Sequence, residues 1–456
     1  MMNLLLEAQN ISTICRTFLF ALVITMLGLE PSGAVVVDVG DGSGNTTAPA
    51  DDPGFANVGQ RGVGGAIYLG NRWVLTAAHL REGNVVFGGQ EFAHIPAEAV
   101  QVSNPAGETE TEETDLRLLR LEEDPGLPAL RLPCNAIQPG SVVTLIGRGH
   151  DREPDRSYWS VEEGPEDGDD VWTAVETEAD SDRSGFRTLD TQTLRWGESL
   201  VNATNVGSDS NGFGDVLAFK TLFDTGFQID NLAQAVRGDS GGAAFQKNED
   251  LWELVGVIYA VDLLENQPGT TRTAIYGDQS WVADLFRYIE EIRNIADFEA
   301  SIGDIDGDGT ITTLDIDAMV AAINRDSESC HYDLDGSNQV DNTDLTLLLE
   351  SAGTLPGDAD LDGQVGFSDF LQVSNSFGQQ TSGWAAGDFD GDGQTSFADF
   401  LVISGSFGAG FASPSTASAS SVAAVPEPVS SRSFLLVFVW LAIRRLNGSN
   451  RRNFGV

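Results

Sequence analysis

Three side chains before residue 245 have the types and the order needed for nucleophilic catalysis. His79 ends a Thr-Ala-Ala-His run, Asp115 opens a stretch that mixes leucine with arginine, and Ser240 is the centre of Gly-Asp-Ser-Gly-Gly. A neutral serine hydroxyl is a weak nucleophile, so it needs a general base, and a histidine oriented by a carboxylate supplies one. The chain order His, Asp, Ser is one of those known for this triad. We therefore predict Ser240 as nucleophile, His79 as general base and Asp115 as the residue that orients the histidine.

The glycines around Ser240 predict a second part of the site. They let the backbone turn sharply, and we expect the backbone N–H groups of Gly238 and Ser240 to form an oxyanion hole. Each motif taken singly also has a simpler interpretation, namely a glycine-rich turn at Ser240 and a structural histidine at His79. The carboxylates of Glu108–Glu113 are neighbouring alternatives to Asp115.

Short β-branched runs separated by turn residues must position these side chains. Such runs recur between residues 60 and 295, which is typical of an all-β barrel or sandwich. They include Gly65–Leu69, Trp73–Leu75, Asn84–Phe87, Ser141–Ile146 and Leu254–Tyr259. Apolar residues recur with helical spacing across 279–295, which predicts a helix there. We expect the acidic segment 151–210 to form extended surface loops.

Residues 60–295 resemble a trypsin/chymotrypsin-type serine protease in the motifs around His79, Asp115 and Ser240. The resemblance implies an all-β double barrel closed by a helix, with a domain over 60–297. It also implies cleavage of peptide bonds in a polypeptide substrate through an acyl-enzyme, with no cofactor for the catalysis itself.

The resemblance further implies a specificity pocket that includes Gln234, Tyr259 and Val261. Gln234 lies six residues before Ser240, where trypsin-like enzymes have the floor of this pocket. Its side chain is neutral, so a strong preference for arginine or lysine is not supported. Tyr259 stands where the family usually has serine, which leaves the preferred substrate open.

Activation is a separate question. A run beginning at Arg61 resembles an activation cleavage site, but it lies too close to His79, so we predict that it belongs to a strand. Whether Asp239 needs a new N-terminal ammonium as its partner is left open by the sequence.

Four aspartate-rich loops between residues 303 and 408 form internal repeats, each followed by an apolar helical stretch. Calcium takes six to eight oxygen ligands, and an EF-hand loop supplies them from positions 1, 3, 5, 7, 9 and 12, with glycine at position 6. Asn338 replaces that glycine in the second loop, and asparagine tolerates a positive φ. The oxygen donors that we predict are Asp304, Asp306, Asp308, Thr310 and Asp315; Asp333, Asp335, Ser337 and Asp344; Asp358, Asp360, Asp362, Gln364 and Asp369; and Asp388, Asp390, Asp392, Gln394 and Asp399.

Aspartate at position 12, with a following helix but no preceding one, resembles the dockerin type I repeat. The resemblance implies a small α-helical EF-hand/dockerin-like region with structural Ca²⁺, arranged as one pair at 303–353 and another at 356–408. It also implies a cohesin-like or surface partner. Loop positions 10 and 11 depart from the cohesin-binding pattern, so calcium-ordered spacing or surface assembly is an alternative. They hold Thr313-Leu314, Asn342-Thr343, Phe367-Ser368 and Phe397-Ala398.

Both ends of the chain carry targeting features. An apolar run followed by Ser32-Gly33-Ala34 predicts a signal peptide at 1–34, and residues 35–59 read as an exposed leader. After a Ser/Ala-rich linker at 409–424, residues 425–456 hold Pro-Glu-Pro, a short apolar run and arginines. This tail resembles a PEP-CTERM sorting signal, which implies a transient membrane contact. We expect export across a bacterial inner membrane to the envelope, the surface or the medium.

The net charge excludes one class of function, and the cysteine content bears on disulfide bonds. A formal net charge of −44 argues against nucleic-acid binding, because phosphates would be repelled. Of three cysteines, Cys15 lies in the signal peptide while Cys134 and Cys330 fall in different predicted domains, so we predict no disulfide framework.

The alternative to a peptidase is a non-catalytic surface adhesion or assembly protein on a protease-like scaffold.

Overall fold

The computed structural model describes residues 35–80, 83–165, 169–209, 212–269, 272–296, 303–380 and 383–411. The predicted signal peptide, the sorting signal and most of the 409–424 linker lie outside these ranges. Within them, no helix is both long enough and apolar enough to cross a membrane.

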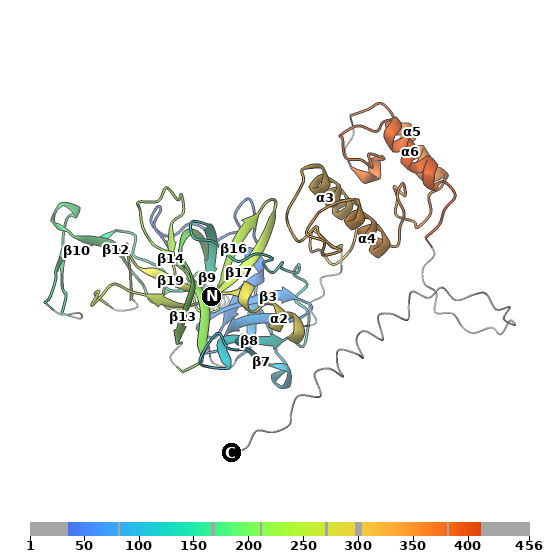
Figure 1. Ribbon diagram of the computed structural model, residues 1–456. Coiled ribbons are helices and arrows are strands. Elements are labelled where there is room, and N and C mark those ends of the chain that lie inside the picture. The colour runs from blue at the N-terminus through green and yellow to red at the C-terminus, as the bar shows by residue number, and fades with distance from the viewer. Residues whose placement is uncertain are drawn as a thin grey trace, which may run out of the picture. The chain divides into compact units, whose positions relative to one another are not determined.

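The first β-structure is a seven-stranded antiparallel sheet with the order β6-β5-β2-β3-β4-β8-β7. Figure 1 labels its strands β3, β7 and β8. Strand β4 is buried along its whole length, because β3 and β8 flank it and its Trp-Val-Leu-Thr-Ala run is mostly apolar. The strands are β2 Val58–Arg61, β3 Gly64–Gly70, β4 Trp73–Ala77, β5 Val85–Phe87, β6 Gln90–Phe92, β7 Val100–Ser103 and β8 Glu113–Arg120. The run that begins at Arg61 comprises the last residue of β2, a turn at residues 62–63 and the start of β3, so the prediction that it belongs to a strand holds only for its two ends.

The second is a closed six-stranded barrel with the order β13-β14-β19-β17-β16-β9. Its strands are β9 Val142–Gly147, β13 Arg195–Asp209, β14 Asp215–Leu222, β16 Ala243–Asn248, β17 Leu251–Asp262 and β19 Gln279–Asp284. The prediction of one helix over 279–295 is wrong for its first part. β19 pairs with both β14 and β17 and so closes the barrel, and only α2 Ile289–Ile295 is helical after the short 3₁₀ turn η5 Leu285–Arg287.

Much of the acidic segment 151–210 is a sheet, which corrects our expectation of surface loops. β10 Ser157–Glu162 pairs with β11 Val171–Val175 and with β12 Arg183–Arg187, and β12 pairs with β18 Thr273–Ile275 (Figure 1). Because β18 lies far along the chain, local sequence signals gave no indication of this pairing.

The prediction of an exposed leader at 35–59 is wrong at both of its ends. β1 Val36–Val37 pairs with β15 Ala233–Gln234, and Val35 is 1% exposed in the core of the second barrel. Val58 begins β2 and is also buried. The described residues before β19 also include the short 3₁₀ turns η1 Phe55–Asn57, η2 Pro96–Glu98 and η3 Glu178–Asp180.

Each of the four repeats contributes one helix after its loop, as we predicted. The helices are α3 Thr313–Asn324, α4 Asn342–Ala352, α5 Phe367–Ser376 and α6 Phe397–Ser406, with the 3₁₀ turn η6 Trp384–Ala386 before the fourth loop. One apolar cluster takes buried residues from both predicted pairs, including Ile316, Leu348, Val373 and Ile403. The indole of Trp384 also donates to the Asp358 carbonyl at 2.7 Å. The two pairs therefore share a core and are not separate modules.

Cys134 and Cys330 form a disulfide, contrary to our prediction. They are 196 residues apart in the sequence, with Cα atoms 6.0 Å apart. Such a distant pair has no spacing signature, so only the folded chain reveals it.

Candidate active site

His79 and Asp115 are brought together by two neighbouring strands. Ala77, the last residue of β4, pairs with Leu116 of β8, and the Ala78 amide donates to the Asp115 carbonyl at 3.1 Å. The Asp115 side chain is fully buried. Its Oδ1 accepts from the His79 backbone N–H at 2.8 Å, and its Oδ2 lies 2.6 Å from His79 Nδ1. This contact favours a proton on Nδ1, which leaves Nε2 as the basic nitrogen of the neutral ring.

Ser240 lies on a turn whose shape depends on its glycines. Gly238 has φ +99° and Gly241 has φ +82°, a region where other residues are strained. Ser240 Oγ donates to the Tyr259 carbonyl at 3.3 Å. The hydrogen bonds of the described residues include none between Ser240 and His79, and such catalytic hydrogen bonds commonly tighten only when substrate is bound.

Gly65 of β3 connects the serine turn to the histidine strand. Its N–H donates to the Ser240 carbonyl at 2.7 Å, and its own carbonyl accepts from Thr76 Oγ1 at 2.8 Å. Thr76 is three residues before His79 on β4. A Cβ on Gly65 would lie 2.8 Å from backbone atoms of Gly241 and Gly242. The close approach of the sheet to the barrel therefore requires a glycine here, and it sets the histidine strand against the serine turn.

Two backbone amides of this turn are available to a ligand. In the described part of the chain, the N–H groups of Gly238 and Ser240 donate to no other group. The amides on either side of Ser240 are used differently, because Asp239 N–H donates to the Val236 carbonyl and Gly241 N–H donates to the Ile258 carbonyl. Free donors at Gly238 and Ser240 are what an oxyanion hole requires.

The Asp239 carboxylate holds the turn that carries Ser240 through two hydrogen bonds. It is fully buried, with Oδ1 accepting from Gly149 N–H at 2.6 Å and Oδ2 accepting from Val236 N–H at 2.7 Å. Burial raises the pKa of Asp239 from 3.8 to about 7, and the two amide hydrogen bonds lower it only part of the way back.

Part of the chain is similar in sequence to known proteins. Residues 42–163 match the family model described as Trypsin. Human kallikrein-7 is 31% identical over 104 residues, and this match covers 21% of the chain and 41% of kallikrein-7. The chain carries a trypsin-like serine protease domain. The family-model match contains His79 and Asp115 but ends before Ser240.

Solved structures similar to this chain include a serine protease and a viral protease. Neuropsin, a serine protease expressed in the limbic system of mouse brain, is 18% identical with a TM-score of 0.32, covering 55% of this chain and 98% of neuropsin. The NS6 protease from murine norovirus 1 is 14% identical with a TM-score of 0.28, covering 52% of this chain and 93% of NS6. Both TM-scores are low, so the assignment of the trypsin-like domain rests on the sequence matches.

The three residues predicted for the specificity pocket have different environments in the trypsin-like domain. Gln234 on β15 is fully buried, and within the described chain neither polar atom of its amide has a hydrogen-bond partner. The Tyr259 hydroxyl lies 2.6 Å from Ser208 Oγ, and the Tyr259 ring is buried. Val261 is half-buried beside the core of the second barrel.

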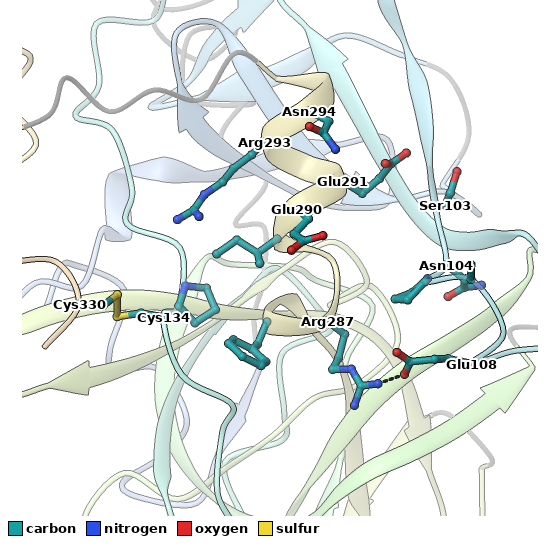
Figure 2. A pocket seen from close by; sticks show the side chains of 15 residues that line it. Ser103, Asn104, Glu108, Cys134, Arg287, Glu290, Glu291, Arg293, Asn294 and Cys330 are labelled. Carbon is teal, nitrogen blue, oxygen red and sulfur yellow. Dashed lines mark ion pairs between the residues drawn. A yellow bond between two sulfur atoms is a disulfide. The ribbon is translucent and has the colours of Figure 1, made fainter. Parts of the chain in front are cut away.

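Two hollows lie on this part of the chain, and Gln234, Tyr259 and Val261 line neither of them. One, of about 640 Å³, is lined by Gln101, Glu112, Glu113 and Phe213 among others, and the Phe213 ring packs edge-on against His79 with centroids 5.9 Å apart. Figure 2 shows the other, of about 690 Å³, which lies beside α2 and the disulfide and contains an ion pair between Arg287 and Glu108. His79, Asp115 and Ser240 line neither hollow, and the first is the one connected to His79, through Phe213.

The four aspartate loops fold alike, and each brings three of the predicted carboxylates together. The ligand atoms of loop positions 1, 3 and 12 lie within 4.8 Å of one another in every loop. The position-12 residue is fully buried in each and accepts from loop amides; for Asp315 these are the N–H groups of Ile305 and Thr312, both at 2.7 Å. These position-12 residues are Asp315, Asp344, Asp369 and Asp399. As predicted, Asn338 adopts the positive φ of the glycine it replaces, at 64°.

The position-5 residues do not join these clusters. Asp308, Asp362 and Asp392 each accept from the amide two residues on, at 2.8 Å, which belongs to Thr310, Gln364 or Gln394. Ser337 Oγ donates to the Gln339 carbonyl at 3.2 Å. The residues nevertheless fit a cation, because Asp388 Oδ1 is buried and, in the described chain, has no hydrogen-bond partner.

Sequence reasoning missed the surroundings of Asp239. Gly147 and Gly149 of the second barrel leave the space that its carboxylate fills, since a Cβ on either would collide with a carboxylate oxygen. Isolated glycines near the end of a predicted strand were the available signal. Their role became visible only once the serine turn was placed against them.

Proposed function

We propose that this protein is an exported serine endopeptidase that cleaves polypeptides through an acyl-enzyme. The observation that carries the proposal is the contact between His79 Nδ1 and the buried Asp115 carboxylate, 2.6 Å, with the serine turn joined to the same strand through Gly65. A buried carboxylate in this position is costly unless it stabilises a charge that forms on the imidazole.

The chemistry assigns one role to each group. His79 Nε2 accepts the proton of Ser240 Oγ as that oxygen attacks the substrate carbonyl, and Asp115 stabilises the resulting imidazolium. The amides of Gly238 and Ser240 donate to the oxyanion, and loss of one such donor costs about 10²- to 10³-fold in kcat in related chemistry. His79 then protonates the leaving amine, and water releases the acyl group by the reverse path.

Covalent labelling tests this proposal without knowledge of the substrate. We expect a fluorophosphonate probe to label the folded protein, and Ser240→Ala to abolish labelling. The matched control is Ser208→Ala, a serine whose hydroxyl contacts the Tyr259 hydroxyl and not its carbonyl. Labelling that persists in Ser240→Ala, or none in a folded wild-type protein, would instead favour the surface adhesion or assembly protein.

The specificity pocket is proposed to recognise a polar, uncharged substrate side chain. Gln234 provides both a donor and an acceptor that lack partners within the described chain, and its neutral amide has no charge to select arginine or lysine. Digestion of a peptide library tests this, with Gln234→Leu expected to lower cleavage after polar residues. A library cut mainly after arginine or lysine would contradict it.

The repeats are proposed to bind structural Ca²⁺. The predicted donors at positions 1, 3 and 12 converge in all four loops, and Asp388 keeps an unpartnered buried oxygen. Bound Ca²⁺ would offset the mutual repulsion of these carboxylates and so stabilise the shared core around α3 to α6.

Calorimetry of the full chain tests the calcium proposal. Saturating Ca²⁺ should raise the melting temperature, since a ligand at a thousand times its Kd stabilises by about 4 kcal/mol, and chelator should reverse it. Asp315→Asn should reduce the shift, whereas the exposed Asp155→Asn outside the loops should not. A melting temperature that is the same with Ca²⁺ and with chelator would contradict the proposal that the repeats bind Ca²⁺.

We also propose that the protein is exported, that its C-terminal tail is a sorting signal, and that it binds a cohesin-like or surface partner. They are supported by the sequence features at 1–34, 425–456 and the repeats. Fractionation of a bacterial host should place the protein outside the inner membrane, and deletion of 425–456 should redistribute it between envelope and medium. Retention in the cytoplasm would contradict export.

A further inference from the structure

Glu253 is a buried carboxylate of the second barrel that the proposed catalysis does not use. It lies on β17 and is 3% exposed. Three groups converge on its Oε1, which accepts from Asn248 Nδ2 at 2.9 Å and lies 2.9 Å from His331 Nε2 and 3.4 Å from Cys134 Sγ. A buried carboxylate is costly unless its oxygens have partners, so these neighbours decide what the group can do.

The sulfur beside this carboxylate contributes nothing to it while the disulfide is intact. A disulfide sulfur has no proton, so Cys134 Sγ cannot donate a hydrogen bond to Glu253 Oε1 in the oxidised chain. A thiol at the same place would donate to that oxygen, and a thiolate would require a cation between the two negative atoms. The position of the sulfur therefore favours a role for the reduced cysteine.

The surrounding groups have the types and the spacing of a zinc site. The ligand atoms of Cys134, Cys330 and His331 lie within 4.8 Å of one another, and Glu253 Oε1 adds an oxygen to this set. Zinc in proteins takes four such ligands in a tetrahedron, with bonds of about 2.3 Å to sulfur and about 2.1 Å to nitrogen or oxygen. These bond lengths place a sulfur and an oxygen ligand about 3.6 Å apart, against 3.4 Å between Cys134 Sγ and Glu253 Oε1.

Other contacts hold the two sides of this cluster together when the disulfide is reduced. Glu249 lies in the turn between β16 and β17, and its Oε2 accepts from Ser327 Oγ at 2.7 Å and from Arg325 Nη2 at 3.1 Å. Its Oε1 accepts from the Glu328 backbone N–H at 3.2 Å. The segment that carries residues 330 and 331 is therefore attached to the barrel independently of the sulfurs.

The sulfurs are open to a small molecule. Cys330 is exposed, and both cysteines line the hollow of about 690 Å³ beside α2 (Figure 2). A site that binds a metal ion needs such an entry path. A small reductant or a hydrated ion can therefore reach the cluster without any unfolding of the barrel.

We propose that this cluster is a redox-gated zinc site, so that a disulfide and a metal ion are alternative links between the trypsin-like domain and the repeats. Its ligands are Cys134 Sγ, Cys330 Sγ, His331 Nε2 and Glu253 Oε1. An external dithiol reduces the S–S bond, each protein sulfur takes up a proton, and the reductant leaves as its own disulfide. Zn²⁺ then releases the two thiol protons to water and binds both thiolates, the carboxylate and the lone pair of Nε2, while the imidazole proton resides on Nδ1.

Cobalt titration of the full chain tests this inference, because Co²⁺ occupies zinc sites and its bonds to thiolates absorb in the near ultraviolet. The chain is reduced with a dithiol, freed of the dithiol under argon, and kept in saturating Ca²⁺. Calcium prefers oxygen ligands, so it occupies the aspartate loops and not the thiolates. We expect a single equivalent of Co²⁺ to produce the thiolate absorption, Zn²⁺ to abolish it, and the oxidised chain to show none.

The decisive variant is His331→Gln, because it removes a ligand and leaves the disulfide in place during folding. We expect it to weaken Zn²⁺ binding by the reduced chain by at least about 10- to 100-fold, since loss of an outer-shell partner alone costs that much. Glu253→Gln should behave alike. The matched control is His150→Gln, whose Nδ1 contacts the Leu189 carbonyl, and it should bind Zn²⁺ as the wild type does. An unchanged Zn²⁺ affinity in His331→Gln would overturn the inference.

Two further outcomes would also overturn it. One is a reduced chain that circular dichroism shows to be folded but that gives no thiolate absorption with Co²⁺. The other is equal Co²⁺ binding by the oxidised and reduced chains, which would place the ion in the aspartate loops only. Both results are independent of Ser240, so they leave the peptidase proposal untouched.

A second measurement applies if reduction unfolds the chain. Zn²⁺ should then restore the fold and slow the alkylation of both thiols by a maleimide at least about 10-fold, because metal binding to such a site is coupled to folding. Intact mass counts the alkylated thiols. A reduced chain that stays unfolded with Zn²⁺, or thiols that react equally fast with and without it, would overturn the inference.

Discussion

Asp239 should make the free energy of unfolding of this protein fall as pH rises, and replacing it should remove that dependence. The perturbation is Asp239→Asn in a Ser240→Ala background. Burial raises the pKa of Asp239 from 3.8 to about 7. At about 1.36 kcal/mol per pKa unit, this corresponds to about 4 kcal/mol.

The sign follows from which state holds the proton. Between about pH 4 and pH 7 the folded chain keeps Asp239 protonated while the unfolded chain has released that proton, so the free energy of unfolding decreases through this window and is level above it. Asparagine does not titrate. The free energy of unfolding of Asp239→Asn minus that of its parent should therefore become more positive from pH 5 to pH 8, by roughly 3 kcal/mol.

Urea unfolding followed by tryptophan fluorescence measures this difference. Burial also raises the pKa of Asp278 and Asp284, each to about 6, but both are present in the two proteins compared and cancel. Asp284→Asn is the matched control, and its own difference should change nearer pH 6. A constant difference for Asp239→Asn between pH 5 and pH 8 would refute the claim that this carboxylate is buried without a counter-charge.

The remaining predictions concern the triad and its supports. Asp115→Asn should lower kcat by about 10⁴-fold with little change in KM, measured on any cleaved peptide, because the histidine loses its oriented tautomer; a loss below tenfold would argue against the triad. Gly149→Ala should destabilise the protein by about 1–3 kcal/mol in urea unfolding, since the added Cβ collides with Asp239, and an unchanged midpoint would contradict that packing. Tyr259→Phe should cost about 1 kcal/mol through the lost contact with Ser208 while fluorophosphonate labelling persists, because Ser240 uses the Tyr259 carbonyl. Ser208→Ala should match it, and loss of labelling in either variant would show that this hydroxyl pair supports the turn.

Residue types and local spacing were sufficient to predict candidate catalytic groups in this protein. His79, Asp115 and Ser240 could be proposed because nucleophilic catalysis restricts which residues can take part and because short motifs surround each. Most short strands and the four loop–helix repeats were also predictable, since alternation, turn residues and loop position depend on neighbours in the chain. The positive φ of Asn338 followed from the chemistry of a single side chain.

Contacts between distant segments were not predictable, because no local pattern encodes them. Residues 279–284 have helical spacing but form β19, since two barrel strands offer them hydrogen bonds that a helix end cannot match. Cys134 and Cys330 pair across 196 residues.

Asp239 shows most clearly the difference between what local sequence predicts and what contacts between distant segments decide. The sequence by itself determined that a carboxylate precedes the nucleophile and left its partner open. Only the tertiary structure decided that Gly147 and Gly149 make room for it and that Val35 packs beside it. The physical reason is that an unpaired carboxylate destabilises the protein, and needs a partner, only when folding removes the water that solvates it.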